Sequence, residues 1–230
     1  MFSLEDHNGE LGAVVVAAGS SERMGGMDKM RCKLLGKPVL SYSLATLEGC
    51  PLVKEVVLVV SKDNLPWSNI LIKELDCKKV VAIIEGGERR QDSVKLGLSH
   101  ISDSRWVLVH DGARPCIESG LVERGFETAQ KTGAAVCAIP LNDTIKVVGG
   151  DFNIIRTLPS GDLWAAQTPQ VFSRSILEEA HQKVLELVRD DSAMVENIGN
   201  AVSVFMGSYL NVKITIPEDI ILAEAILGAR

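Results

Sequence analysis

A run of small residues followed by two cations stands directly after the first apolar segment of the chain. The segment Val14–Ala18 leads into Gly19, and Arg23 and Lys29 follow that glycine. Small residues let a backbone approach a ligand closely and present N–H groups to it, which suits phosphate oxygens. The run has neither a G-x-G-x-x-G nor a G-x-x-x-x-G-K-[ST] pattern. It predicts a triphosphate site in which the two cations neutralise leaving pyrophosphate; the alternative is an ordinary turn with solvent-exposed charges.

A second cluster of chemically useful residues ends another apolar run. Trp106–His110 is followed by Asp111, Gly112 and Arg114. Ligands of open α/β sheets bind at the carboxyl ends of strands. Mg²⁺ prefers one or two carboxylates together with phosphate oxygens, so Asp111 is predicted to hold Mg²⁺ on a nucleotide. The alternatives are that Asp111 caps the next helix and that Arg114 forms an ordinary ion pair.

Two glycines and a serine follow a third apolar run, and one lysine stands near the C-terminus. Gly86 and Gly87 would allow close approach to a flat base, and Ser93 could hydrogen-bond a pyrimidine edge. The alternative is a common turn in which Ser93 serves the local backbone. Lys213 is a candidate third cation, although a lone strand lysine is usually solvated.

The elements that must position these residues follow from the hydrophobic pattern. Strands are predicted at Ala13–Ala18, Glu55–Val60, Lys79–Ile84, Trp106–His110 and Ala134–Ile139. Amphipathic helices are predicted between them at Pro38–Glu48, Asn64–Leu75, Arg90–His100 and Glu118–Lys131. Near-continuous Val/Ile runs separated by helices are typical of parallel strands buried on both faces. The pattern therefore predicts an α/β fold with a doubly wound, mostly parallel sheet.

The alternation stops after Pro140. Two short runs, Asp143–Val148 and Asn153–Leu158, flank a Gly-Gly turn and predict a protruding β-hairpin arm at about 141–163. The arm could cross a dimer interface, or it could be a surface ribbon of its own subunit. The remaining elements are predicted as helices near Ser173–Leu187 and Asp191–Ile198, strands at Val202–Phe205 and Val212–Ile216, and a helix after Pro217. With no linker or repeat, residues 1–230 are expected to form one domain.

Composition narrows the class of protein. The net charge of −6 has both signs interspersed, which argues against a nucleic-acid surface. No apolar run is long enough to span a membrane, and the first twelve residues are polar rather than typical of a signal peptide, so a cytoplasmic location is expected. The five cysteines lack C-x-x-C spacing and are expected to be reduced, and four scattered histidines do not indicate a zinc site.

In order, the motifs AAGSSERMGG…DK, GGERRQDSV, VHDGARP, NDTIK, AQTPQ and NVKITIPED resemble the 2-C-methyl-D-erythritol 4-phosphate cytidylyltransferase family. The resemblance runs from about Ala13 to Glu224. It implies a Rossmann-like nucleotidyltransferase fold, Mg²⁺ as cofactor and a homodimer. It also implies transfer of CMP from CTP to 2-C-methyl-D-erythritol 4-phosphate, giving 4-diphosphocytidyl-2-C-methyl-D-erythritol and pyrophosphate. The nucleophile would be a phosphate monoester with a second pKa of about 6, so no general base is needed.

The resemblance implies a role for each candidate residue. Three residues of the first loop would line the triphosphate: Ala17, Ala18 and Gly19. The transition state at the α-phosphorus would be stabilised by Arg23 and Lys29, with Lys213 in the same cationic cluster. Cytosine would be recognised by Gly86, Gly87 and Ser93. Asp111 would bind Mg²⁺ and contact substrate, with Gly112 near the ribose.

On the acceptor side, Arg114 would lie near the methylerythritol unit and Thr168 would line the pocket. The hairpin would swap across the homodimer and bring Thr144 to the partner's active site. Lys33 is a second candidate for the loop lysine, but the spacing from Lys29 to Gly36-Lys37-Pro38 fits the family without a gap.

The sequence departs from the family pattern on the acceptor side. Ser160 stands where an arginine of the arm is expected to hold the acceptor's phosphate, and Arg189 stands where a threonine is usual. Arg156 or Arg189 is therefore predicted to supply that charge from another direction. The departures leave ribitol 5-phosphate cytidylyltransferase open as an alternative. More distant alternatives are a pyrophosphorylase using UTP or GTP, a non-catalytic nucleotide-binding homologue and a purely structural dimer module.

Overall fold

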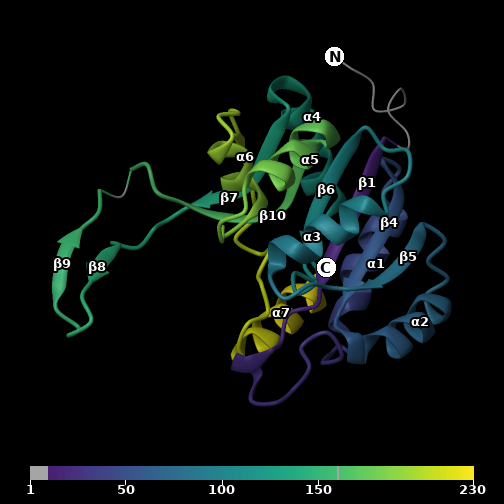
Figure 1. The fold of residues 1–230 in the computed structure, drawn as a ribbon. Coiled ribbons are helices and arrows are strands. Elements are labelled where there is room, and N and C mark those ends of the chain that lie inside the picture. The colour runs from purple at the N-terminus through teal and green to yellow at the C-terminus, as the bar shows by residue number, and fades with distance from the viewer. Residues whose placement is uncertain (1–9, 160) are drawn as a thin grey trace.

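A seven-stranded sheet forms the centre of the computed structural model, which describes residues 10–159 and 161–230 (Figure 1). From one edge to the other, its strands are β11 (Ser203–Met206), β7 (Ala134–Pro140), β10 (Trp164–Ser173), β6 (Trp106–Asp111), β1 (Leu11–Ala17), β4 (Val53–Val60) and β5 (Val80–Glu85). Only β10 runs antiparallel to its neighbours, β6 and β7; the other adjacent pairs are parallel. The predicted mostly parallel α/β sheet is thereby confirmed. Ser160, which stands in place of the expected arginine, lies outside the described residues.

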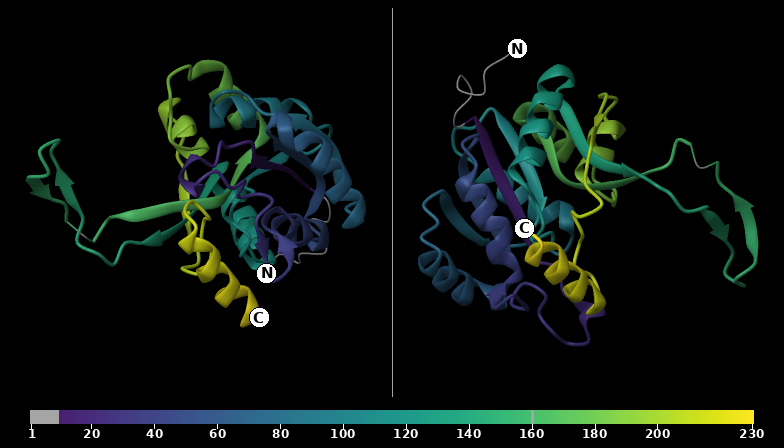
Figure 2. Two further views of the ribbon diagram at one scale, coloured as in Figure 1. Left: turned by 90° about the horizontal axis from the view of Figure 1, so that it is seen from below. Right: turned by 180° about the vertical axis from the view of Figure 1, so that it is seen from behind.

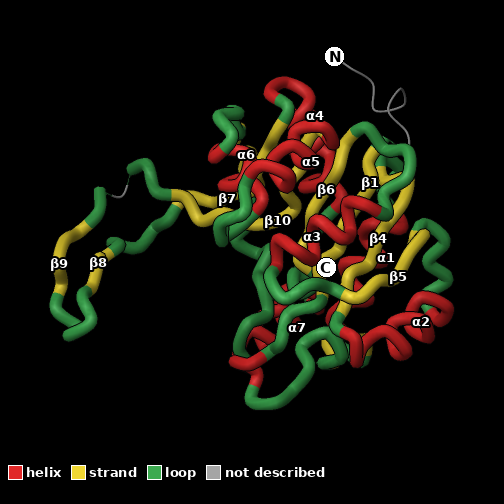
Figure 3. The backbone as a smooth tube through the Cα atoms, in the orientation of Figure 1, coloured by secondary structure: helices red, strands yellow, loops and turns green. Residues whose placement is uncertain are grey.

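Helices cover both faces of this sheet, as the red tubes on either side of the yellow strands show in Figure 3. One face carries α1 (Val39–Gly49), α2 (Leu65–Glu74) and α4 (Ser119–Thr132). The other carries α3 (Arg90–Ser99), α5 (Arg174–Lys183) and α6 (Asp191–Asn197). The central strands are therefore buried on both sides, which explains why β4 ends in an unbroken run of valines and leucine from Val56 to Val60.

A smaller apolar cluster lies where the chain ends. The last helix, α7 (Glu218–Gly228), packs through Ala223 and Ile226 against Met24 and Leu34. Met24 belongs to the 3₁₀ helix η2 (Glu22–Met24), and Leu34 to the two-stranded ribbon of β2 (Lys33–Leu34) and β3 (Lys37–Pro38). A second 3₁₀ helix, η3 (Lys62–Asn64), precedes α2. The cluster anchors the base of the loop that contains Lys29.

The hairpin arm consists of β8 (Lys146–Val148) and β9 (Ile154–Thr157), which pair antiparallel. It projects away from the sheet, beyond β7 and β10, in each of the views in Figures 1 and 2. Its tip is apolar, with Phe152 90%, Ile154 61% and Ile155 68% exposed. The structure thus confirms the predicted hairpin and leaves its apolar residues uncovered in one subunit.

The sequence-based prediction differs from the structure at two places in the second half of the chain. The long strand β10 was not predicted, because Pro169 cannot donate to a ladder and Gln167, Thr168 and Gln170 are polar. The structure accommodates the proline where the β10–β7 register shifts between Ala166 and Gln170. Conversely, Val212–Ile216 was predicted as a strand but is irregular, because its only described backbone hydrogen bond to another segment runs from Ile214 to Ala113 O.

No helix in the described part of the chain has the length and apolar character needed to cross a membrane.

Candidate active site

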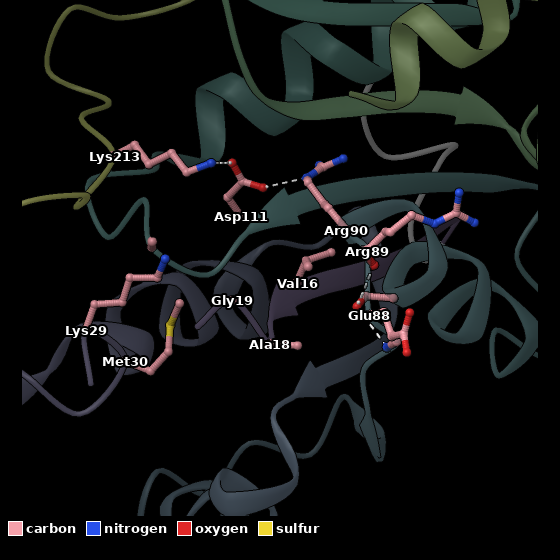
Figure 4. A pocket seen from close by; sticks show the side chains of 13 residues that line it. Val16, Ala18, Gly19, Lys29, Met30, Glu88, Arg89, Arg90, Asp111 and Lys213 are labelled. Carbon is pink, nitrogen blue, oxygen red and sulfur yellow. Dashed lines mark hydrogen bonds and ion pairs between the residues drawn. The ribbon is translucent and has the colours of Figure 1, made fainter. Parts of the chain in front are cut away.

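Two cavities lie side by side at the carboxyl ends of β1 and β6, where Val16 pairs with Asp111 across the sheet. The first cavity combines the loop after β1, the loop before α3 and the end of β6 (Figure 4). Its lining residues are Val16, Ala18, Gly19, Lys29, Met30, Gly87, Glu88, Arg89, Arg90, Ser93, Asp111, Ala113 and Lys213. The volume of this cavity is about 140 Å³.

The second cavity adjoins the first and is built from the end of β6, the middle of β10 and the segment before α6. Its lining residues are Arg90, Asp111, Arg114, Ala166, Gln167, Thr168, Gln170, Arg189, Asp190 and Lys213. The two cavities share three residues, Arg90, Asp111 and Lys213. A ligand in either cavity would therefore meet the same carboxylate and the same two cations.

Three cations surround the shared carboxylate. Lys213 Nζ lies 2.8 Å from Asp111 Oδ2, Arg90 Nε lies 3.2 Å from Oδ1, and Arg114 Nε lies 3.8 Å from Oδ2. Figure 4 shows the Lys213 and Arg90 side chains on opposite sides of the carboxylate. Burial alone would raise the pKa of Asp111, but Arg90, Lys213 and Arg114 outweigh burial and hold that pKa well below its usual range. Asp111 is therefore an anion, and the cations around it leave a positive excess.

A chain of hydrogen bonds fixes the backbone beneath Asp111. The Arg114 carbonyl can only accept, so His110 Nε2–H donates to it at 3.2 Å, and His110 Nδ1 then accepts from the Thr168 hydroxyl at 3.1 Å. Thr168 in turn accepts from the Asp111 N–H at 3.0 Å. Burial lowers the pKa of His110 to about 4, which keeps the ring neutral and this pattern intact at pH 7. Thr168 thus positions Asp111 and also lines the second cavity.

The loop after β1 brings Lys29 over Gly19. A Cβ placed on Gly19 would lie 3.4 Å from Lys29 Nζ, so the ammonium group rests against the glycine backbone. Asn64 ties the loop to the rest of the molecule by donating to Asp28 Oδ2 at 2.6 Å. Burial and then Lys213 lower the pKa of Lys29, while Asp111 opposes them. Such crowding of like charges would be relieved by an anion, so the loop suits phosphate binding.

The loop before α3 is tightly folded. The Gly87 N–H donates to Ser93 Oγ at 3.1 Å, and that hydroxyl donates to the Arg89 carbonyl at 3.3 Å. A Cβ on Gly86 would stand 2.5 Å from Ala18 Cβ and 2.7 Å from Ser93 Oγ, so only glycine fits there. Ser93 lines the first cavity, yet both of its described hydrogen bonds serve the local backbone. Gly86 itself packs below the lining.

Other predicted site residues lie off the two cavities. Ala17 and Gly112 pack together underneath, where a Cβ on Gly112 would be 3.1 Å from Ala17 Cβ. Arg23 is exposed on η2 and lines neither cavity, although its charge contributes to the lowered pKa of Lys29. Thr144 is exposed two residues before β8, on the arm that projects away from the sheet (Figure 1).

One charged residue shared by both cavities had no predicted role. Arg90 lines both cavities, and its Nη1 lies 2.6 Å from Oδ2 of the buried Asp191. Arg90 stood inside the GGERRQDSV motif beside Arg89, and the sequence offers no sign of which arginine turns inward. The structure distinguishes them, since Arg89 instead pairs with Asp92 at 2.7 Å.

Asp111 is also the residue that could hold a metal ion. No group of three or more histidine, cysteine, aspartate or glutamate side chains able to hold a metal is found in the described parts of the chain. A carboxylate offers about four lone-pair sites, and Arg90 and Lys213 occupy two of those of Asp111. A single carboxylate with spare lone pairs fits Mg²⁺ that arrives with phosphate ligands, rather than an all-protein cage.

The chain is similar in sequence and in structure to proteins of one kind. The family model described as IspD, 2-C-methyl-D-erythritol 4-phosphate cytidylyltransferase, matches residues 11–229. Proteins of that name from Dehalococcoides mccartyi and Halalkalibacterium halodurans are 45% and 40% identical, each alignment covering 96% of this chain and 97% and 98% of the relative. A 4-diphosphocytidyl-2C-methyl-D-erythritol synthase structure from Anaerococcus prevotii has a TM-score of 0.84 at 28% identity and 97% coverage of both chains. The 2-C-methyl-D-erythritol 4-phosphate cytidylyltransferase of Thermus thermophilus has a TM-score of 0.78 at 33% identity, covering 94% of this chain and 98% of that one.

Proposed function

Because this chain belongs to the 2-C-methyl-D-erythritol 4-phosphate cytidylyltransferase family and transfers CMP from CTP to that acceptor, we propose that the first cavity binds CTP and the second binds the acceptor. The observation that carries the assignment is that the two cavities meet at Asp111 and Lys213. Two substrates bound there would place the acceptor's phosphate beside the α-phosphorus. The enzyme is thus a nucleotidyltransferase of isoprenoid-precursor synthesis whose chemistry takes place at this junction.

On the CTP side, Gly19 and Ala18 line the triphosphate, and Lys29 lies against its oxygens. Support comes from the position of Lys29 Nζ over Gly19 and from the crowding of cations around it. The loop of Gly87 and Ser93 shapes the part of the cavity that receives the cytosine ring. Arg23, exposed nearby on η2, would approach the outer phosphates only by a change of side-chain conformation.

The reaction is a displacement at phosphorus. An oxygen of the acceptor's phosphate attacks the α-phosphorus of CTP, and the bond from that phosphorus to the β-phosphate bridging oxygen breaks, releasing pyrophosphate. A phosphate monoester is already largely anionic at pH 7, so the residues need only position the substrates and neutralise charge. Lys29, Lys213 and Arg114 would do this around the reacting phosphates.

We include Mg²⁺ in the proposal, with Asp111 as its protein ligand. Asp111 is ionised, has spare lone pairs, and lines both cavities. When bound, the ion would neutralise part of the charge on the phosphates of CTP.

On the acceptor side, we propose that Arg189 binds the acceptor's phosphate. Arg189 lines the second cavity, is exposed to it, and has no carboxylate partner within the described residues. Arg156, the other candidate, is exposed on β9 of the arm and lines neither cavity of its own subunit, so it would act only across an exchanged dimer. Arg114 already uses one of its donor groups within the fold, since its Nη1 donates to the Asn211 carbonyl at 2.7 Å. Arg189 is therefore the cation in this cavity that is most available to a phosphate.

Replacing Arg189 by alanine is expected to raise the KM for methylerythritol 4-phosphate about 10-fold or more, because a charge-assisted hydrogen bond is lost. The KM for CTP should stay within about twofold, since Arg189 does not line the first cavity. Initial rates with each substrate varied in turn would measure both constants. Arg156→Ala is the companion variant. A rise in the acceptor KM in Arg156→Ala alone would assign phosphate binding to the arm. An unchanged acceptor KM in both variants would contradict phosphate binding by either arginine.

We also propose that the chain is a single domain that functions as a homodimer in the cytoplasm. The apolar tip of the arm, with Phe152 and Ile155 uncovered, is the kind of surface that a second subunit would bury. Such an exchange would carry the arm, and Thr144 with it, toward the partner's second cavity. The cytoplasmic location is supported by the substrate, because CTP is an intracellular nucleotide.

Pyrophosphate release tests the acceptor directly. With CTP and Mg²⁺, release is expected with methylerythritol 4-phosphate and at most a trace with ribitol 5-phosphate. Release with ribitol 5-phosphate only would keep the CTP assignment and reject the acceptor assignment. Release with neither acceptor would contradict the proposed function as a whole.

A further inference from the structure

Arg90 is the one residue shared by both cavities to which the reaction as proposed gives no role. It is the first residue of α3, and 26% of its side chain is exposed. Its guanidinium lies between two carboxylates, with Nε 3.2 Å from Asp111 Oδ1 and Nη1 2.6 Å from Asp191 Oδ2. Both carboxylates thereby act on a single rigid group.

Asp191 has no route to a substrate. Its side chain is 1% exposed, it is the first residue of α6, and it lines neither cavity. Three successive ion pairs of alternating charge connect Asp191 to Arg90, Arg90 to Asp111, and Asp111 to Lys213. Burial opposes the charge on Arg90, but Asp191 and Asp111 together raise its pKa above the usual arginine range. Arg90 is therefore a permanent cation held from behind by a buried anion.

We propose that Arg90 is the positioning residue for Asp111. By holding Oδ1 at a fixed direction, it leaves Oδ2 facing Lys213 and the reacting phosphates, and Asp191 acts only by holding Arg90 in place. This inference rests on the proposed role of Asp111. It requires a planar group with several donors, because Nε and Nη1 must reach two carboxylates at once, which the single ammonium of lysine does not do.

The next residue, Gln91, also connects the start of α3 to the segment before α6. Gln91 Nε2 donates to the Glu186 carbonyl at 3.0 Å, and Gln91 Oε1 accepts from the Val188 N–H at 3.2 Å. The segment that leads to Arg189 is thus fixed to the first turn of α3. The turn that orients Asp111 also holds the wall of the second cavity, so a rotated Asp111 would be misplaced relative to both substrates.

A purely structural role for Arg90 must be separated from a positioning role. Removing a guanidinium from between two carboxylates would also destabilise the fold, so a loss of activity in an alanine variant could not distinguish the two roles. Arg90→Lys keeps the charge, and Asp191→Asn removes the buried anion without substituting Arg90 or Asp111. Arg174→Lys is a matched control, because Arg174 is 28% exposed and pairs with Glu178 at 2.7 Å, away from both cavities.

The experiment compares kcat, both KM values and the thermal midpoint of the full-length variants. Arg90→Lys is expected to lower kcat about 10- to 100-fold with KM for CTP within about threefold, because a small misplacement of a reacting group has effects of that size. Asp191→Asn should give a smaller loss, and the double variant should resemble Arg90→Lys alone, because Asp191 acts only through Arg90. Arg174→Lys should retain the parental kcat.

Three outcomes would overturn the inference. One is Arg90→Lys with kcat within twofold of the parent, and another is losses that multiply in the double variant. If Arg90→Lys does not fold, parental kcat in Asp191→Asn is the third. Asp111→Asn in the same assay separates the role of Arg90 from the role of Asp111. An active Asp111→Asn variant would reject the role of Asp111 itself. An inactive Asp111→Asn variant together with a fully active Arg90→Lys variant would reject only the role of Arg90.

Discussion

Asp111→Asn is expected to lower kcat on the order of 10²- to 10³-fold, the range observed when a preorganised electrostatic group is removed from an active site. The substitution keeps the shape of the side chain and removes the charge that Lys213, Arg90 and Arg114 surround. It would also take away the proposed Mg²⁺ ligand. The KM for methylerythritol 4-phosphate should change less than kcat, since the cations that attract its phosphate remain.

The same substitution has a cost in stability, because it leaves buried cations without their anion. Breaking a buried ion pair by removing one partner costs about 3–5 kcal/mol. The thermal midpoint must therefore be measured with kcat, at a temperature where the variant is folded. Asp103→Asn is the control: Asp103 is an exposed aspartate paired with Lys54 at 2.9 Å and lines neither active-site cavity. A folded Asp111→Asn variant with kcat within a few fold of the parent would reject Asp111 as a catalytic residue.

The parallel strands could be predicted from the sequence because their physical cause is local. A strand segment buried on both faces is expected to be apolar, and β4 is apolar and buried from Val56 to Val60. Among the helices between them, α4 shows the amphipathic pattern most clearly. The motifs that come directly after these strands could then be assigned to one site, since the carboxyl ends of parallel strands share one edge of the sheet.

Strand β10 could not be predicted in this way, because its polar residues are satisfied by distant partners. Gln170 is 1% exposed, donates to Asp190 Oδ2 at 2.9 Å and accepts from the Ser192 N–H at 3.0 Å. Thr168 bonds to His110 and Asp111, which precede it by more than fifty residues. Hydrophobic periodicity contains no information about such bonds, so a buried polar strand reads as a loop.

In the candidate site too, local features could be predicted from the sequence and contacts between distant residues could not. The loop around Gly19 and the end of β6 stand out by local pattern, but the contact of Lys213 with Asp111 joins residues 102 positions apart. The sequence made Lys213 a candidate third cation and the family resemblance placed it in the cationic cluster, but neither indicated its contact with Asp111. Nothing in the sequence distinguished Arg90 from Arg89, because the direction of each side chain depends on whether α6 supplies a buried partner. Asp191 supplies that partner to Arg90 alone.

Lys29→Ala is expected to lower kcat/KM for CTP on the order of 10²- to 10³-fold, with most of the loss in kcat. The Lys29 ammonium lies over Gly19 and is partly buried beside Lys213, so its charge is poorly screened by water. Its attraction to the phosphates should grow as charge moves toward the leaving pyrophosphate, and an interaction that strengthens in the transition state affects kcat. Removing a crowded cation should not destabilise the fold, so the thermal midpoint is expected to stay the same or rise.

Lys33→Ala is the matched comparison for this loop. Lys33 is four residues further along, on β2, is exposed, and lines neither cavity. If net positive charge near the loop were all that mattered, the two variants would lose activity equally, and both losses would shrink together as salt is raised. Parental kcat in Lys33→Ala, with a loss in Lys29→Ala that persists at high salt, would instead require a cation at one defined point above Gly19. A larger loss in Lys33→Ala would transfer the phosphate-binding role to Lys33 and require the loop to close differently when CTP is bound.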